Sequence, residues 1–127
     1  MFSKYLISIP LANKETISVA SGLTQISTKH GVCNTLISDR GTEFTSVCIA
    51  EVCCQLCIPQ DTPGYVHHCL GACERSHRTL EERLSSYVSK NSNNWVGFLA
   101  SITFSTNQSV NAGLGYSPHH IIFGVSE

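Results

Sequence analysis

Short β-like runs alternate with longer helical patterns along this 127-residue chain, and this alternation limits the folds open to it. β-Branched and aromatic residues predict strands at residues 4–10 and 33–38. Apolar residues that recur every 3.6 positions predict helices. These helices cover residues 13–29, 46–57, 70–90 and 95–110, with a short extended piece at 58–63. Asn13 is the expected cap of the first helix and His30-Gly31 its stop. The long helix should form an apolar stripe that includes His77, Leu80 and Leu84, and the last helix should bury Trp95, Leu99, Ile102 and Phe104. The order predicts an α/β fold, and the length suits a single domain spanning residues 1–127.

The predicted strand at residues 4–10 has no earlier strand to pair with. Strand-helix-strand units bury their sheet on both faces and normally continue on either side. We therefore expect a sheet that lacks its first strand. Charged residues make up only 13% of the chain, so we also expect more neutral surface than a self-sufficient small domain exposes.

Composition excludes several classes of protein. A hydrophobic content of 42% excludes intrinsic disorder. Eight Lys and Arg face nine Asp and Glu, giving a formal net charge of −1, so any nucleic acid must be met by a local basic patch. The sequence shows neither a signal peptide nor an apolar run of membrane-spanning length. An intracellular location is expected.

Seven cysteines are an odd number, and without a secretion signal they are predicted to be reduced thiols. A zinc-binding module is one alternative, because the sequence brings several ligand types together. They are Cys54, Cys57, His67, His68, Cys69, Cys73 and His77. Against zinc, several of these cysteines fall on predicted apolar helix faces, where free cysteine commonly acts as a small hydrophobe.

Two acidic residues, Asp39 and Glu74, are the candidates for chemistry. Asp39 lies at the carboxyl end of a predicted strand, where open α/β sheets place their working residues, and Gly41 is expected to let the backbone turn away. Glu74 is expected in the first turn of the long helix. Converging carboxylates would hold divalent cations for phosphoryl transfer, and such hard ligands suit Mg²⁺. The alternatives are an ordinary Asp-x-Gly turn and an exposed ion pair of Glu74 with Arg78.

Four separated motifs together resemble a known family. They are ISDRGTEFTS (37–46), GACERSHRTL (71–80), Trp95 with Phe98, and GYSPHHIIFG (115–124). Their order and spacing resemble the integrase catalytic core of retroviruses and of Ty3/gypsy-like LTR retrotransposons. The resemblance covers essentially the whole chain. The residues from 40 to 73 that separate Asp39 from Glu74 are one fewer than is usual in that family.

The resemblance implies an RNase H-like fold, with a mixed central sheet flanked by helices. It also implies a triad of two Asp and one Glu that binds two Mg²⁺ or Mn²⁺ ions for DNA 3′-processing and strand transfer. Asp39 matches the second Asp and Glu74 matches the Glu. No residue matches the first Asp, which in the family lies on a strand preceding the segment similar to Phe2–Tyr5. We therefore expect an integrase core lacking its first strand or strands, with Mg²⁺ or Mn²⁺ binding weakened or lost, and without catalytic activity. A degenerate or domesticated remnant that binds DNA or protein is the alternative.

The resemblance further implies DNA partners, namely element ends and target DNA, together with a homodimer and a nuclear location. Tyr65, His67 and His68 stand where the family commonly has Tyr-His-Pro-Gln, so a histidine replaces the Gln that approaches DNA. Basic residues along the predicted long helix would add affinity for phosphates. They are Arg75, Arg78, Arg83 and Lys90. The alternative for all of these residues is a solvated surface.

Overall fold

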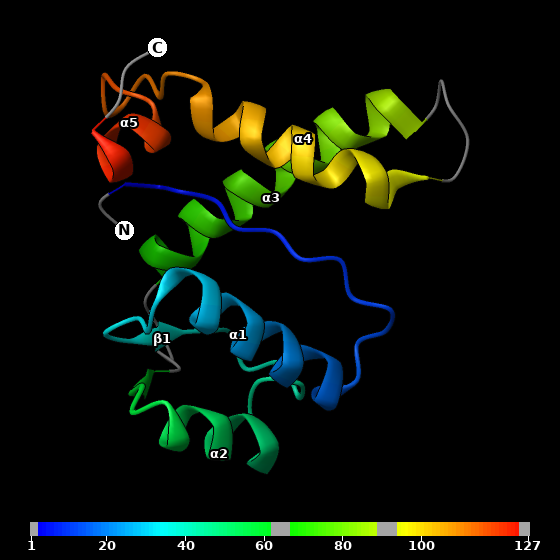
Figure 1. The fold of residues 1–127 in the computed structure, drawn as a ribbon, viewed down its shortest axis with the longest axis vertical. Helices are drawn as coiled ribbons and strands as arrows, with labels where there is room; N and C mark the ends of the chain where they lie inside the picture. The colour runs from blue at the N-terminus through cyan, green and yellow to red at the C-terminus, as the bar shows by residue number, and fades with distance from the viewer. Residues whose placement is uncertain (1–2, 62–66, 89–93, 125–127) are drawn as a thin grey trace. The chain divides into compact units, whose positions relative to one another are not determined.

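The computed structural model describes residues 3–61, 67–88 and 94–124, and side chains throughout them except at 67–70 and 72. Figure 1 shows a mostly helical chain. Its elements are α1 (Thr16–His30), β1 (Leu36–Ile37), α2 (Val47–Gln55), β2 (Gln60–Asp61), α3 (His67–Val88), α4 (Trp95–Gln108) and α5 (Pro118–Phe123). The chain divides into two compact units. We call Leu11–Leu70 the first unit, and Met1–Pro10 with Gly71–Glu127 the second unit.

The first unit is built around the packing of α1 on α2. Its core consists of Ala20, Ile49, Cys53 and Ile58, and Ile49 is fully buried. Ser46 caps α2 by accepting a hydrogen bond from the Ile49 amide, at 3.4 Å. The predicted helices at 13–29 and 46–57 are therefore confirmed, with slightly different ends.

The ends of α1 show what the sequence pattern resolves and what it misses. Gly31 ends the helix with φ at 87°, as the predicted stop requires. The predicted cap at Asn13 is wrong, because the N-cap residue is Glu15, which makes no side-chain cap bond. Asn13 instead accepts a hydrogen bond from the amide of Glu15, which precedes the helix, and one from the hydroxyl of Ser18, which lies in its first turn.

The sheet is smaller than the sequence predicts. Within the described residues it consists of two parallel strands, with Leu36 opposite Gln60 and Ile37 opposite Asp61. The strand predicted at 33–38 is thus reduced to its end, and the extended piece at 58–63 supplies its partner. A mixed central sheet is not confirmed.

The strand predicted at residues 4–10 is wrong. This segment is extended but joins no sheet among the described residues. The buried Asn107 of α4 takes the place of a neighbouring strand, because its side chain accepts from the Leu6 amide at 2.9 Å and donates to the Leu6 carbonyl at 2.8 Å. Lys4 has a positive φ of 53°, which also interrupts a regular strand.

The second unit has its core along α4. Leu99 and Ile102 are buried as predicted, but Trp95 is 38% and Phe104 56% exposed, so their predicted burial is wrong. Trp95 is the first helical residue, and Phe104 lies about 200° around the helix from Ile102. Phe104 packs edge-to-face against His119 of α5, with ring centroids 6.2 Å apart.

The long helix α3 begins at His67 and ends at Val88, whereas the sequence pattern predicts 70–90. Its predicted apolar stripe is partly confirmed, since Leu80 and Leu84 are half-buried while His77 is exposed. In the described part of the chain, none of the helices combines the length and apolarity needed to cross a lipid bilayer.

The sequence prediction misses α5. Ser117 caps this short helix by accepting from the His120 amide at 3.1 Å, and Pro118 occupies its first turn. Gly124 closes it with φ at 70°. Ser-Pro at the start and Gly just beyond the end are the usual signals of such a helix, and both were present in the sequence.

Candidate functional site

Asp39 directly follows the parallel strand pair of the first unit. The Leu36 amide donates to the Pro59 carbonyl at 2.9 Å and the Ser38 amide to the Asp61 carbonyl at 3.3 Å. These bonds place Asp39 just past the carboxyl end of β1, as the sequence predicts. Its side chain is exposed, so the carboxylate is open to a ligand.

The loop after Asp39 is a tight turn held by its own polar groups. The carboxylate Oδ1 of Asp39 accepts a hydrogen bond from the Gly41 amide at 3.1 Å, which confirms the Asp-x-Gly turn. The Gly41 carbonyl then accepts from the amides of Phe44 and Thr45, at 3.0 and 3.1 Å. This turn uses Oδ1 alone, since Asp39 Oδ2 bonds no residue that the structure describes.

Gly41 has a different role from the one expected. It does not adopt a positive φ, the backbone conformation that favours glycine. A Cβ at this position would lie 2.9 Å from Glu43 Oε2 and 3.1 Å from Asp39 Oδ1. The missing side chain therefore makes room for two carboxylates beside the turn.

Two acidic residues near Asp39 were missed by sequence reasoning. Glu43 borders the same glycine, and Asp61 lies at the carboxyl end of β2, opposite Ile37. The signal for Asp61 was available, because carboxyl ends of neighbouring parallel strands share one edge of a sheet. It required recognising residues 58–63 as a partner of the preceding strand.

Glu74 lies on α3 in the second unit. The prediction that it sits in the first turn is wrong, because α3 starts at His67 and Glu74 comes about two turns later. The expected ion pair with Arg78 is also wrong, since Arg78 Nε pairs with Glu82 Oε1 at 3.0 Å. Glu74 is exposed and makes no ion pair with a residue that the structure describes. Asp39 belongs to the other unit, and the convergence of the two carboxylates stays a prediction.

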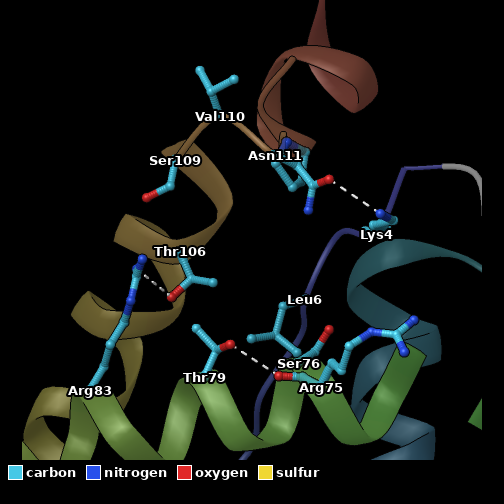
Figure 2. A pocket seen from close by; sticks show the side chains of 11 residues that line it. Lys4, Leu6, Arg75, Ser76, Thr79, Arg83, Thr106, Ser109, Val110 and Asn111 are labelled. Atoms are coloured by element: carbon cyan, nitrogen blue, oxygen red, sulfur yellow. Dashed lines mark hydrogen bonds between the residues drawn. The ribbon is translucent and has the colours of Figure 1, made fainter. Parts of the chain in front are cut away.

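The predicted nucleic-acid residues are described only in part. Tyr65 and Lys90 lie outside the described residues, as do the side chains of His67 and His68. Arg78 is exposed and held by Glu82. Arg75 and Arg83 line an open pocket of about 290 Å³ in the second unit, drawn in Figure 2.

The structure describes most of the cysteines but only part of the predicted zinc-binding residues. Five cysteines are free thiols, at 33, 48, 53, 54 and 57. Burial raises the pKa of the Cys53 thiol, and the neighbouring Cys33 raises it further. Within the described residues, no three His, Cys, Asp or Glu side chains gather closely enough to hold a metal ion. Cys69 and the two histidines before it have undescribed side chains, so the zinc alternative stays a prediction.

Comparison with known sequences connects the chain to transposable elements. It is 36% identical over 124 residues to the retrovirus-related Pol polyprotein from transposon 412 of Drosophila melanogaster. It is 30% identical over 120 residues to a transposon-derived protein of Caenorhabditis elegans. The chain spans 10% of the first relative and 42% of the second, so it corresponds to a part of each. No protein-family model matches it.

Comparison with solved structures identifies the fold as that of the retroviral integrase catalytic core, which is RNase H-like. The core of BIV integrase is 26% identical and superimposes with a TM-score of 0.79, over 94% of this chain and 78% of that one. The HTLV-2 core, solved in complex with magnesium, is 19% identical with a TM-score of 0.72, over 86% and 70% of the two chains. A chain of a simian T-cell lymphotropic virus intasome, solved in complex with a PP2A regulatory subunit, is 19% identical and superimposes with a TM-score of 0.78. This match covers 87% of the present chain and 41% of that one.

The resemblance seen in the four motifs is therefore confirmed on two independent grounds. The fold defines the class, an integrase-type catalytic core. In sequence, the chain is similar to a part of a retrotransposon Pol polyprotein.

Proposed function

We propose that this chain is part of an integrase of an LTR retrotransposon and serves DNA integration. The observation that supports this most is the 36% identity to the transposon 412 polyprotein across 96% of the chain. The match to the BIV integrase core supports the same reaction class, polynucleotidyl transfer at DNA ends. The sequence match and the structural match both extend over nearly the whole chain, so they include the residues of the motifs.

Asp39 and Glu74 are the residues that we assign to a divalent cation. Both are exposed, Asp39 keeps Oδ2 available, and Glu74 is not engaged by a described cation. Carboxylate oxygens are the ligands that Mg²⁺ and Mn²⁺ prefer, so the donor set fits. When bound, such an ion supplies an activated water or hydroxyl and stabilises the leaving oxygen. The chain's own contribution is to fix Asp39 at the strand end through the Gly41 hydrogen bond.

Metal binding can be measured without any DNA substrate. Free Mn²⁺ is followed by electron paramagnetic resonance while the chain is titrated. Asp39→Asn and Glu74→Gln should each weaken Mn²⁺ binding roughly tenfold, because each removes a charged ligand. Glu81→Gln is the matched control on the same helix. Equal Mn²⁺ binding by Asp39→Asn and the unmodified chain would refute the assignment.

A polypeptide limited to these 127 residues has no residue matching the first Asp of the family. A two-metal site needs a ligand shared by both ions, so we expect this polypeptide to show no strand transfer. The assay is 3′-processing and strand transfer of labelled DNA ends with Mn²⁺. Cleavage that Asp39→Asn abolishes would contradict this expectation.

The DNA-binding role rests on Tyr65, His67, His68, Arg75 and Arg78. Arginine side chains on an exposed helix face supply sequence-independent contacts to phosphates, which weaken as salt rises. Element ends and target DNA are the proposed partners, a homodimer the proposed assembly and the nucleus the proposed location. If the chain binds DNA but shows neither Mn²⁺ binding nor catalysis, the alternative applies, and the chain is a DNA-binding remnant of an integrase.

A further inference from the structure

The open pocket of Figure 2 is lined by three positive side chains, Lys4, Arg75 and Arg83. They come from the extended N-terminal segment and from α3, while the end of α4 closes the other side. We propose that this pocket binds a phosphate-class oxyanion, with these three side chains as its ligands. The proposal is independent of the metal assignment above, since it uses neither Asp39 nor Glu74.

Among the residues that the structure describes, no carboxylate pairs with the three cations of the pocket. No acidic residue is among its lining residues. Lys4 Nζ donates to the amide oxygen of Asn111 at 3.2 Å, and Arg83 Nη1 to the hydroxyl of Thr106 at 3.0 Å. Both partners are neutral. A hollow with several cations and no anion favours a negatively charged ligand.

The hydrogen-bonding capacity of the pocket favours an acceptor rather than a neutral polyol. Three hydroxyls in the lining already donate their single hydrogen to helix carbonyls, those of Thr79 to Arg75, Thr106 to Ile102 and Ser109 to Ser105. The donors that a ligand can reach include the remaining N–H groups of the three cations and the side-chain NH2 of Asn111. Phosphate oxygens accept several such bonds at once.

The positions of the cations favour several phosphates in series. Arg75 and Arg83 are eight residues apart on α3, which separates their Cα atoms by about 12 Å along the helix. Figure 2 shows Arg83 directed toward Thr106 and Lys4 toward Asn111, so neutral partners hold two of the three cationic side chains in place. Preorganised donors lose little freedom when a ligand binds.

Tripolyphosphate is the probe for the shared chemistry, and calorimetric titration of the chain measures its affinity. Arg83→Gln should weaken binding about tenfold, because it removes a charged donor. Arg83→Lys should retain most of the affinity, which excludes a fold defect as the cause. Lys29→Gln is the matched control, since Lys29 is an exposed cation on α1 and does not line the pocket.

The source of the phosphate is decided by competition. A fluorescent single-stranded oligonucleotide that tripolyphosphate displaces, and that Arg83→Gln weakens, identifies a nucleic-acid backbone as the ligand. Tripolyphosphate binding without such displacement identifies a free polyphosphate. The proposal is overturned if tripolyphosphate does not bind at millimolar concentration, or if Lys29→Gln weakens its binding as much as Arg83→Gln. These outcomes leave the Mn²⁺ measurement untouched, so the two proposals fail separately.

Discussion

At the scale of single residues, the sequence predicts the position of Asp39 but not its surroundings. The Asp-Arg-Gly signal locates the strand end and the turn, and the structure confirms both. It could not show that Gly41 serves by leaving space beside two carboxylates, because that role depends on where Glu43 folds back. Likewise, adjacent charges suggested a Glu74–Arg78 pair, but Glu82 competes for the same arginine one turn later.

Cys53 offers a prediction at this scale. Its side chain is 3% exposed, and burial raises its pKa, so both access and the thiolate fraction are reduced. Iodoacetamide should alkylate Cys53 roughly an order of magnitude more slowly than the exposed Cys54 beside it, as measured by peptide mass spectrometry. Equal rates would show that Cys53 is not buried in solution.

The same shift gives a pH dependence of stability. Below the ordinary pKa of a thiol, Cys53 is protonated in both the folded and unfolded states, and its contribution is constant. As pH rises past that value, the unfolded state ionises first, so the free energy of unfolding falls until the folded thiol also ionises. Urea unfolding across mildly to strongly alkaline pH should show this loss, and Cys53→Ala should reduce it.

At the scale of elements, periodicity located the helices better than the strands. Four helices were predicted within a few residues, because each repeats an apolar position every turn. The run at residues 4–10 has the composition of a strand, yet strand pairing depends on a partner that a local pattern does not contain. Asn107, which fills that place, is 101 positions from Leu6.

Helix α2 carries the core of the first unit through Ile49, which is fully buried. Ile49→Ala should cost about 2–5 kcal/mol of stability, because it removes buried methyl groups and leaves a cavity. Val47→Ala on the same helix is the control, since Val47 is 75% exposed and should change stability by less than about 0.5 kcal/mol. Urea unfolding followed by circular dichroism measures both. A cost for Ile49→Ala as small as that of the control would contradict the core assignment.

The extended segment at residues 4–10 depends on Asn107. Asn107→Ala removes two hydrogen bonds to Leu6, and we expect a loss of about 2 kcal/mol, roughly 1 per bond. Hydrogen exchange at the Leu6 amide should become faster in this variant, while the exposed-site variant Ser105→Ala leaves it unchanged. Unaltered protection of Leu6 in Asn107→Ala would mean that another group holds the segment.

At the scale of the whole molecule, the family resemblance was predictable because it rests on motifs spread along the chain. The structure agrees with these motifs, because it superimposes on the catalytic core of BIV integrase over 94% of the chain. The sheet could not be predicted equally well, because only one parallel pair forms within the described residues. The single-domain prediction stays open beside the two compact units.

The surface of the chain predicts self-association. Several large apolar side chains are exposed, among them Ile17 at 74% and Val47 at 75%, while the net charge is only −1. Sedimentation velocity should show a mass that grows with concentration. Ile17→Glu with Val47→Glu should reduce this growth, and both new carboxylates suit the first turn of a helix. A monomer at every concentration would contradict the prediction.

The short pairing of β1 with β2 decides which way Asp39 faces. Side chains alternate between the two sides of a strand, so the pairing of Ile37 with Asp61 sets the direction of every residue that follows closely. One inserted residue between Ile37 and Asp39 would turn the carboxylate to the opposite side, whereas an insertion among the exposed residues 32–35 would be absorbed before the strand. Among diverging copies of this sequence, freedom from insertions in that short span would therefore mark the lineages in which selection still acts on the acid.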